Sequence, residues 1–352
     1  MIKNIFKAGA FLLGMIAFTM VSCSDKNDDP KSTTDTTTVD TTAYAKGADV
    51  SWLTEMEYNG KMFYNASGKQ MDCIELLKSL GINSIRLCVW VNPTTGWCNK
   101  SDVLVKAWRA YKLGMRILID FHYSDSWADP SQQTVPAAWS NYSLTELEQA
   151  VSDHTTDVLT ALKAKGITPE WVQVGNETSN GMLWPTGKAS TSMANYAALN
   201  NAGYSAVKTI FPNAKVVIHL PNGDNNSLYR WMFDGLKSNG GKWDVIGMSL
   251  YPSADTTMTW STKVDNCIAN MKDMISRYKT PVMLCEVGMP WDDAATAKSF
   301  LSDLITKSKA ISSNNCLGIF YWEPEAYGSW NAYTLGAFDD SGKPTEALDA
   351  FK

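Results

Sequence analysis

Eight short apolar runs recur along the chain from residue 47 onward, and amphipathic stretches separate them. Each run has the length of a buried strand, while residues 72–81 and 105–114 have helical spacing and end at a glycine. Repeated βα units predict an α/β fold, a single (β/α)8 TIM barrel over residues 44–352. A doubly wound sheet is the less favoured alternative, because no glycine-rich phosphate loop follows the first run. The runs are residues 47–53, 84–90, 116–122, 171–177, 215–221, 244–251, 281–287 and 317–323.

The first 43 residues indicate export. A basic start and the apolar stretch AGAFLLGMIAFTMV are typical of a signal peptide. Cys23 follows a small serine, as in a bacterial lipobox, although Met20 stands where leucine is usual. We therefore interpret residues 1–22 as a lipoprotein signal peptide, with a plain signal peptide or a signal anchor as alternatives. Residues 23–43 have the Thr/Asp-rich composition of a disordered tether that starts at an acylated Cys23.

An acidic cluster just after Cys23 resembles the export signal of surface lipoproteins in the Bacteroides group. The expected location is the outer membrane, facing the cell surface and held by a lipid. The net charge of −5 argues against nucleic acid as a partner. The six other cysteines form no CxxC pair and no cluster with histidine, so no zinc site is predicted, and their disulfide pairing stays open.

Polar and aromatic residues stand at the ends of most of the runs. In a barrel of this kind, catalysis takes place at the C-terminal ends of the strands. The 14 tryptophans and 14 tyrosines include many in expected loops, which suits either ordinary packing or a sugar-binding surface. The candidate substrate-binding residues are Arg86, Trp90, Asn92, Asp120, His122, Trp127, Asn176, His219, Tyr251 and Trp322.

Two glutamates carry the strongest chemical signal. Glu177 ends the fourth run and Glu286 lies at the end of the seventh, so the barrel brings them to the same mouth. A lone glutamate at a strand end is usually an ion-pair partner. Two at these positions, with Asn176 before the first, favour glycoside hydrolysis, in which one carboxyl acts as acid and the other as nucleophile.

Five motifs together resemble glycoside hydrolase family 53 of clan A, the endo-β-1,4-galactanases: GADVSWL, RLCVWVNP, DFHYSDSWADP, VGNE and YWEPEA. The resemblance covers residues 45–351. It implies retaining endo-hydrolysis of β-1,4-galactan in type I arabinogalactan and pectic side chains, with Glu177 as acid/base and Glu286 as nucleophile. The two carboxyl groups of a retaining enzyme lie about 5–5.5 Å apart. Some bacterial relatives hold calcium in a long loop after the nucleophile, but this loop is short here. No cofactor is therefore predicted, although Asp292 and Asp293 leave calcium open.

The chemistry then sets the expected environment of each carboxyl. Glu177 must start protonated, so repulsion by Glu286 and burial should raise its pKa. Arg86 and a hydrogen bond from Tyr251 should keep Glu286 ionised, and Asn176 should contact the sugar 2-hydroxyl. The expected partners are β-1,4-galactan and galacto-oligosaccharides, bound by a monomer. Two alternatives are another clan A endo-glycanase, a mannanase or cellulase, and a surface lipoprotein that binds glycan without catalysis.

Overall fold

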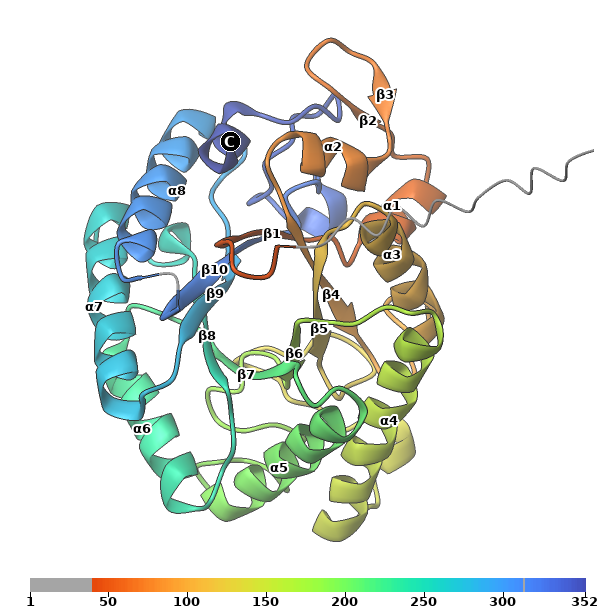
Figure 1. The fold of residues 1–352 in the computed structure, drawn as a ribbon, viewed down its shortest axis with the longest axis vertical. Coiled ribbons are helices and arrows are strands. Elements are labelled where there is room, and N and C mark those ends of the chain that lie inside the picture. The colour runs from red at the N-terminus through yellow and green to blue at the C-terminus, as the bar shows by residue number, and fades with distance from the viewer. Residues whose placement is uncertain (1–39, 313) are drawn as a thin grey trace, which may run out of the picture. The chain divides into compact units, whose positions relative to one another are not determined.

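The computed structural model describes residues 40–312 and 314–352, and Cys23, the signal peptide and the tether up to residue 39 lie outside the described residues. Eight parallel strands close into a barrel in the order β1-β10-β9-β8-β7-β6-β5-β4, and β4 pairs with β1 (Figure 1). The predicted TIM barrel is confirmed. The barrel strands are β1 (Ala45–Asp49), β4 (Ser84–Val89), β5 (Arg116–Phe121), β6 (Trp171–Val174), β7 (Lys215–Leu220), β8 (Val245–Leu250), β9 (Val282–Val287) and β10 (Cys316–Trp322).

Helices surround the barrel, as Figure 1 shows. After β1 the chain also forms a hairpin of β2 (Phe63–Tyr64) and β3 (Gln70–Met71), which the sequence did not predict. After β10 the last helix is a 3-10 helix, Glu346–Phe351, which packs against α8. No helix in the described part of the chain is long and apolar enough to cross a membrane. The α-helices are α1 (Leu53–Tyr58), α2 (Cys73–Ser79), α3 (Lys100–Lys112), α4 (Leu144–Ala164), α5 (Met193–Ile210), α6 (Asn226–Ser238), α7 (Trp260–Tyr278) and α8 (Ala294–Lys309).

Local signals fix where several helices begin and end. Ser143 caps the N-terminus of α4: its side chain accepts from the backbone N–H of Glu146, while the Glu146 carboxylate accepts from the backbone N–H of Ser143. Helix α2 falls within the predicted stretch 72–81, whereas α3 overlaps the predicted stretch 105–114 but begins earlier, at Lys100. Gly81 and Gly114, which end these stretches, have φ of +98° and +67°. Glycine adopts this backbone conformation at a lower energetic cost than other residues.

Two strands end well before the predicted runs do, at Asp49 and not residue 53, and at Val174 and not residue 177. The first run ends as strand at Asp49, because the Asp49 carboxylate accepts hydrogen bonds from both the backbone N–H and the hydroxyl of Ser51 and turns the chain. The fourth run ends at Val174, because Gly175 leaves the strand with φ of +84°. Glu177 therefore lies in the loop after β6, and not on the strand itself.

The interior of the barrel is filled by apolar side chains from seven of its strands. Trp171 of β6 and Phe320 of β10 are fully buried there and meet edge to face, with ring centroids 6.1 Å apart. Gly47 of β1 leaves the space that Phe320 occupies, since a Cβ at this glycine would lie 2.1 Å from the Phe320 ring. The remaining members of this cluster are Ala45, Leu118, Val217, Val245, Met283, Cys285 and Leu317.

The chain enters the barrel at the N-terminal ends of the strands. Arg116, the first residue of β5, forms an ion pair with Glu170 at 2.6 Å and donates a hydrogen bond to the backbone oxygen of Ala43 at 2.5 Å. The same guanidinium lies over the Trp171 ring, 4.4 Å from its centroid. These contacts fix the residues just before β1 against this end of the barrel.

Phe320→Ala should remove the edge-to-face contact with Trp171 inside the barrel and leave a cavity. We expect a loss of about 3–5 kcal/mol in the free energy of unfolding, measured by urea denaturation. Tyr58→Ala is the control, because Tyr58 is 79% exposed and its truncation should change stability by less than about 0.5 kcal/mol. Equal stability of the two variants would contradict this account of the barrel core.

Candidate active site

A cleft of about 700 Å³ opens at the C-terminal ends of the strands. Seven of the predicted site residues line it, and they come from six of the strands or the loops after them. The structure thus brings together Trp90, Trp127, Asn176, Glu177, Tyr251, Glu286 and Trp322. Asn92 lies outside the cleft lining, where its backbone N–H donates to the Asp125 carboxylate at 3.0 Å.

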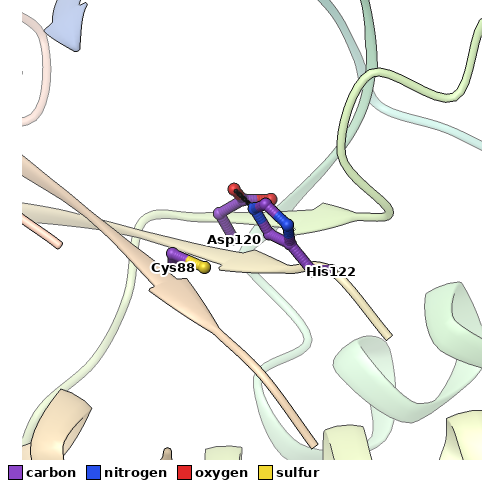
Figure 2. Close-up of side chains that lie close together, drawn as sticks. All are labelled: Cys88, Asp120 and His122. Carbon is purple, nitrogen blue, oxygen red and sulfur yellow. Dashed lines mark hydrogen bonds and ion pairs between the residues drawn. The ribbon is translucent and has the colours of Figure 1, made fainter. Parts of the chain in front are cut away.

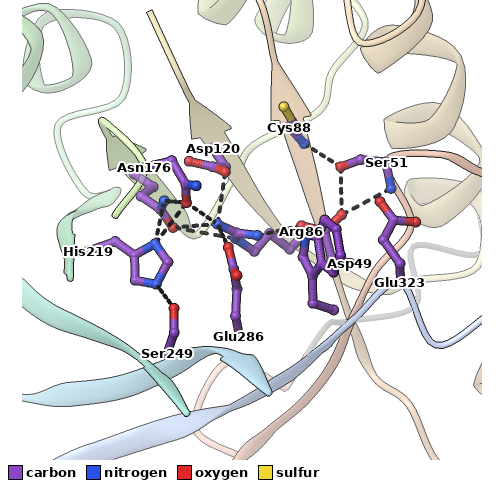
Figure 3. Close-up of polar contacts among 12 residues, drawn as sticks. Asp49, Ser51, Arg86, Cys88, Asp120, Asn176, His219, Ser249, Glu286 and Glu323 are labelled. Atoms are coloured by element: carbon purple, nitrogen blue, oxygen red, sulfur yellow. Dashed lines mark hydrogen bonds and ion pairs between the residues drawn. The ribbon is translucent and has the colours of Figure 1, made fainter. Parts of the chain in front are cut away.

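Four other predicted site residues lie beneath the cleft floor. Arg86, Asp120, His122 and His219 are each at most 2% exposed and do not line the cleft. Their polar atoms are bonded to one another and to the residues above them, as Figure 3 shows for most of this network. We therefore infer that these four side chains hold the residues of the cleft in position. Their predicted direct contact with substrate has no support in this geometry.

Arg86 is the centre of the buried network (Figure 3). Its guanidinium forms ion pairs with Asp49 at 2.6 Å, Asp120 at 2.8 Å and Glu286 at 2.9 Å. It also donates to the side-chain oxygen of Asn176 at 2.9 Å. Burial lowers the pKa of Arg86, but the three carboxylates more than offset this and hold the pKa well above its usual value. Arg86 therefore carries its charge at every relevant pH.

Glu286, the fifth residue of β9, has the contacts expected of an ionised carboxylate. Beside the Arg86 ion pair, the Tyr251 hydroxyl donates to its Oε2 at 2.9 Å. Burial raises the pKa of Glu286, whereas Arg86 and the Tyr251 hydrogen bond lower it in part. The predicted partners of this carboxyl are both present.

Glu177 has a different environment, because no cation contacts its carboxyl group in the described residues. Burial raises the pKa of Glu177 to about 8, and repulsion by Glu286 adds to this shift. The sequence-based argument gave repulsion first, whereas burial is the larger cause. A hydrogen bond from the Ser249 hydroxyl to Oε1 at 2.7 Å works in the opposite direction. At neutral pH the proton shared by the two glutamates therefore resides on Glu177.

Asn176 is held so that one amide hydrogen is left for the cleft. Its Oδ1 accepts from Arg86 at 2.9 Å and from Gln173 at 3.0 Å, and its Nδ2 donates to the backbone oxygen of Ala128 at 2.8 Å. The remaining N–H has no partner in the described part of the chain, and Asn176 lines the cleft. The contact with a sugar 2-hydroxyl stays a prediction.

Cys88, Asp120 and His122 lie close enough together to raise the question of a metal (Figure 2). The Nδ1 of His122 accepts from the Ala128 backbone N–H at 2.9 Å, so Nε2 carries the hydrogen and donates to Asp120 at 2.9 Å. Asp120 is also paired with Arg86, and burial raises the pKa of the Cys88 thiol well above its usual value. The group offers neither a free imidazole nitrogen nor a thiolate, which indicates a structural role.

Aromatic rings form one wall of the cleft. Trp322 packs edge to face on Trp52, Trp127 and Tyr333, with centroid distances of 4.9, 5.6 and 4.7 Å. Trp127 packs in the same way on Trp90, at 4.9 Å. Sequence reasoning missed Trp52, which stood inside an expected strand, and Tyr333, which follows no strand-like run. Flat apolar walls and a few polar groups are typical of a site for a sugar.

Two carboxyl groups at one aromatic-lined barrel mouth, of which Glu286 is paired with Arg86 and Glu177 has a raised pKa, are the arrangement of a glycoside hydrolase. The sequence profile of glycosyl hydrolase family 53 matches residues 45–351, and the chain belongs to that family.

Relatives and solved structures agree with this assignment. The arabinogalactan endo-β-1,4-galactanase of Cellvibrio japonicus is 32% identical, over 99% of this chain and 96% of its own length. The family 53 catalytic domain of Ignisphaera aggregans has a TM-score of 0.80 and 30% identity, covering 88% of this chain and 96% of that one. A structure from a study of two fungal β-1,4-galactanases has a TM-score of 0.80 and 28% identity, covering 88% and 99%.

The rate of hydrolysis should fall as the pH rises through about 8, because Glu177 loses its proton there. The sign follows from its role, since an acid with a raised pKa stays active to a higher pH than a free glutamate. The measurement is kcat/KM against pH, with Glu177→Gln as the variant that should lack this basic limb. If kcat/KM stays constant up to two pH units above the expected decline, the assignment of the catalytic proton to Glu177 is wrong.

Proposed function

We propose that this chain is a retaining endo-β-1,4-galactanase that cuts galactan in type I arabinogalactan and pectic side chains. The observation that carries the proposal is the proton-bearing Glu177 beside Glu286, which is paired with Arg86. Membership of family 53 supports galactan as the substrate, because relatives covering most of this chain are arabinogalactan endo-β-1,4-galactanases by name.

In the proposed reaction the Glu286 carboxylate attacks the anomeric carbon while Glu177 gives its proton to the departing glycosidic oxygen. The Tyr251 hydroxyl keeps one Glu286 oxygen in place, and the ion pair with Arg86 keeps the nucleophile charged. Glu177 is then ionised and takes a proton from the water that hydrolyses the glycosyl-enzyme bond. Each step inverts the anomeric carbon, so the product retains the β configuration.

Reducing-sugar assays on β-1,4-galactan, β-mannan and carboxymethyl cellulose test the substrate. We expect release from galactan alone. A preference for mannan or cellulose would favour another clan A glycanase, and binding without release would favour a non-catalytic protein. Proton NMR of the first product tests the stereochemistry, and an initial α-anomer from galactan would exclude retention.

The two glutamates should respond differently to truncation. Glu286→Ala removes the nucleophile, so galactan hydrolysis should stop, and azide should restore turnover with a product of inverted configuration. Glu177→Ala should slow galactan hydrolysis about 10²–10⁴-fold but should affect an aryl galacto-oligosaccharide far less, because a good leaving group needs little protonation. With this variant, azide should give a product of retained configuration, since it attacks the glycosyl-enzyme. The opposite pattern would exchange the two roles.

We also propose that Cys23 carries a lipid that anchors the enzyme in the outer membrane, facing the cell surface. The support is the small residue before Cys23 and the Thr/Asp-rich stretch after it. Cys23→Ala should move the protein from the membrane pellet to the soluble fraction, while kcat on galactan stays unchanged. Ser24→Ala is the matched control, because it leaves the thiol in place. A Cys23→Ala protein wholly in the pellet would argue against lipidation.

A further inference from the structure

Glu177 has a backbone conformation that is unusual for a residue whose carboxyl group must point at the substrate. Its φ is +45°, in the left-handed region that side chains other than glycine seldom adopt. The neighbouring Thr178 is fixed by a hydrogen bond from its backbone N–H to the backbone oxygen of His219 at 2.9 Å. Such a conformation persists only where the surroundings over-determine it, so the contacts of Glu177 decide where its carboxyl group points.

His219 supplies the first of these contacts. The Glu177 backbone N–H donates to His219 Nδ1 at 3.4 Å, its one hydrogen bond among residues 40–312 and 314–352. Gln173 Nε2 also lies 3.0 Å from that nitrogen and can donate to it. The side-chain oxygen of Asn176 lies 2.9 Å away, but it already accepts from Arg86 and Gln173. A proton on Nδ1 would leave the Glu177 N–H without an acceptor in a buried site, which is costly. This contact favours Nδ1 as the acceptor with the hydrogen on Nε2, whereas the Asn176 oxygen would suit a hydrogen on Nδ1, and the ring of hydrogen bonds around Glu177 requires the first of these tautomers.

Ser249 connects His219 to the carboxyl group of Glu177. His219 Nε2 lies 2.7 Å from the Ser249 hydroxyl oxygen, and that oxygen lies 2.7 Å from Glu177 Oε1. Because the serine oxygen accepts from Nε2, its single hydrogen is directed to Oε1. The pairing of β8 with β9 shifts register between Met248 and Ser249. Irregularities of this kind re-aim side chains near active sites, and here the serine faces the glutamate.

We propose that Glu177, His219 and Ser249 form a closed, one-directional ring of hydrogen bonds that orients the acid/base carboxyl. The ring runs from the Glu177 N–H to His219 Nδ1, from Nε2–H to Ser249 Oγ, and from the Ser249 hydroxyl back to Glu177 Oε1. With Oε1 occupied, the catalytic proton resides on Oε2. His219 and Ser249 are positioning residues, buried at 0% and 1% exposure, and neither lines the cleft. This role rests on the proposed function of Glu177.

The ring also limits how firmly Glu177 holds its proton. A hydrogen bond to a carboxylate favours the charged form, so the Ser249 hydroxyl lowers the pKa that burial and Glu286 raise. The other charged groups that influence Glu177 are Arg86 of β4, which lowers the pKa, and Asp129 of the loop after β5, which raises it. Burial and Arg86 hold the pKa of His219 well below its usual value, so the imidazole is neutral and acts through its single N–H.

Ser249→Ala should therefore move the basic limb of the kcat/KM profile upward by roughly one pH unit, because the glutamate is deprived of a donor to its charged form. It should also lower kcat near neutral pH, where the second step needs Glu177 ionised. His219→Gln should keep the limb near that of the wild type, since the glutamine amide can still donate to Ser249. Ser253→Ala is the matched control, because the Ser253 hydroxyl has no hydrogen-bond partner in the described residues.

If the basic limb of the kcat/KM profile lies at the same pH in Ser249→Ala as in the wild type, and the variant only loses thermal stability, then Ser249 is a structural residue. That result would overturn the proposal. A second measurement does not depend on activity. The chain has three histidines, so ¹⁵N labelling of histidine and comparison with His219→Gln identifies the His219 ring. The expected tautomer has its hydrogen on Nε2, and a hydrogen on Nδ1 would exclude the ring. If the wild-type protein is inactive on galactan but His219 has its hydrogen on Nε2, the proposed substrate is wrong. The proposed ring of hydrogen bonds would still be supported.

Discussion

The site depends on one buried guanidinium. Arg86 is 1% exposed and pairs with Asp49, Asp120 and Glu286, which come from β1, β5 and β9. A buried charge is tolerated only with well-placed partners, and removing one partner leaves an uncompensated charge. Glu286 is thus tied to a cation, whereas no cation among the described residues contacts Glu177. Burial and repulsion by Glu286 raise the pKa of Glu177.

Periodicity predicted the barrel because a parallel strand buried on both faces gives a continuous apolar run. The same logic placed Glu177 and Glu286 at one mouth before any coordinates, since the C-terminal ends of parallel strands meet there. The contacts of Glu286 with Arg86 and Tyr251 could also be anticipated, because Glu286 and Tyr251 stand near strand ends and Arg86 lies inside its strand as the nearest predicted cation. Fold and catalytic pair therefore follow from spacing along the chain.

Other parts of the site depend on local backbone geometry that spacing does not encode. Ser249 reaches Glu177 where the pairing of β8 shifts register, and Trp52 enters the wall because Asp49 turns the chain after β1. His219 was predicted near the substrate, but the inward direction of its ring puts it under the floor. Tyr333 joins the wall from a segment without strand-like periodicity. Each case needs a conformation of one or two residues that no apolar pattern reports.

The chain enters the barrel at the end opposite the cleft. Arg116 holds Ala43 at the N-terminal ends of the strands, whereas the cleft opens at their C-terminal ends. A linker fused directly before residue 40 would therefore leave the barrel at the end away from the cleft. Immobilisation through such a short linker on a bead or a sensor surface would leave the cleft open to a long, slowly diffusing polymer.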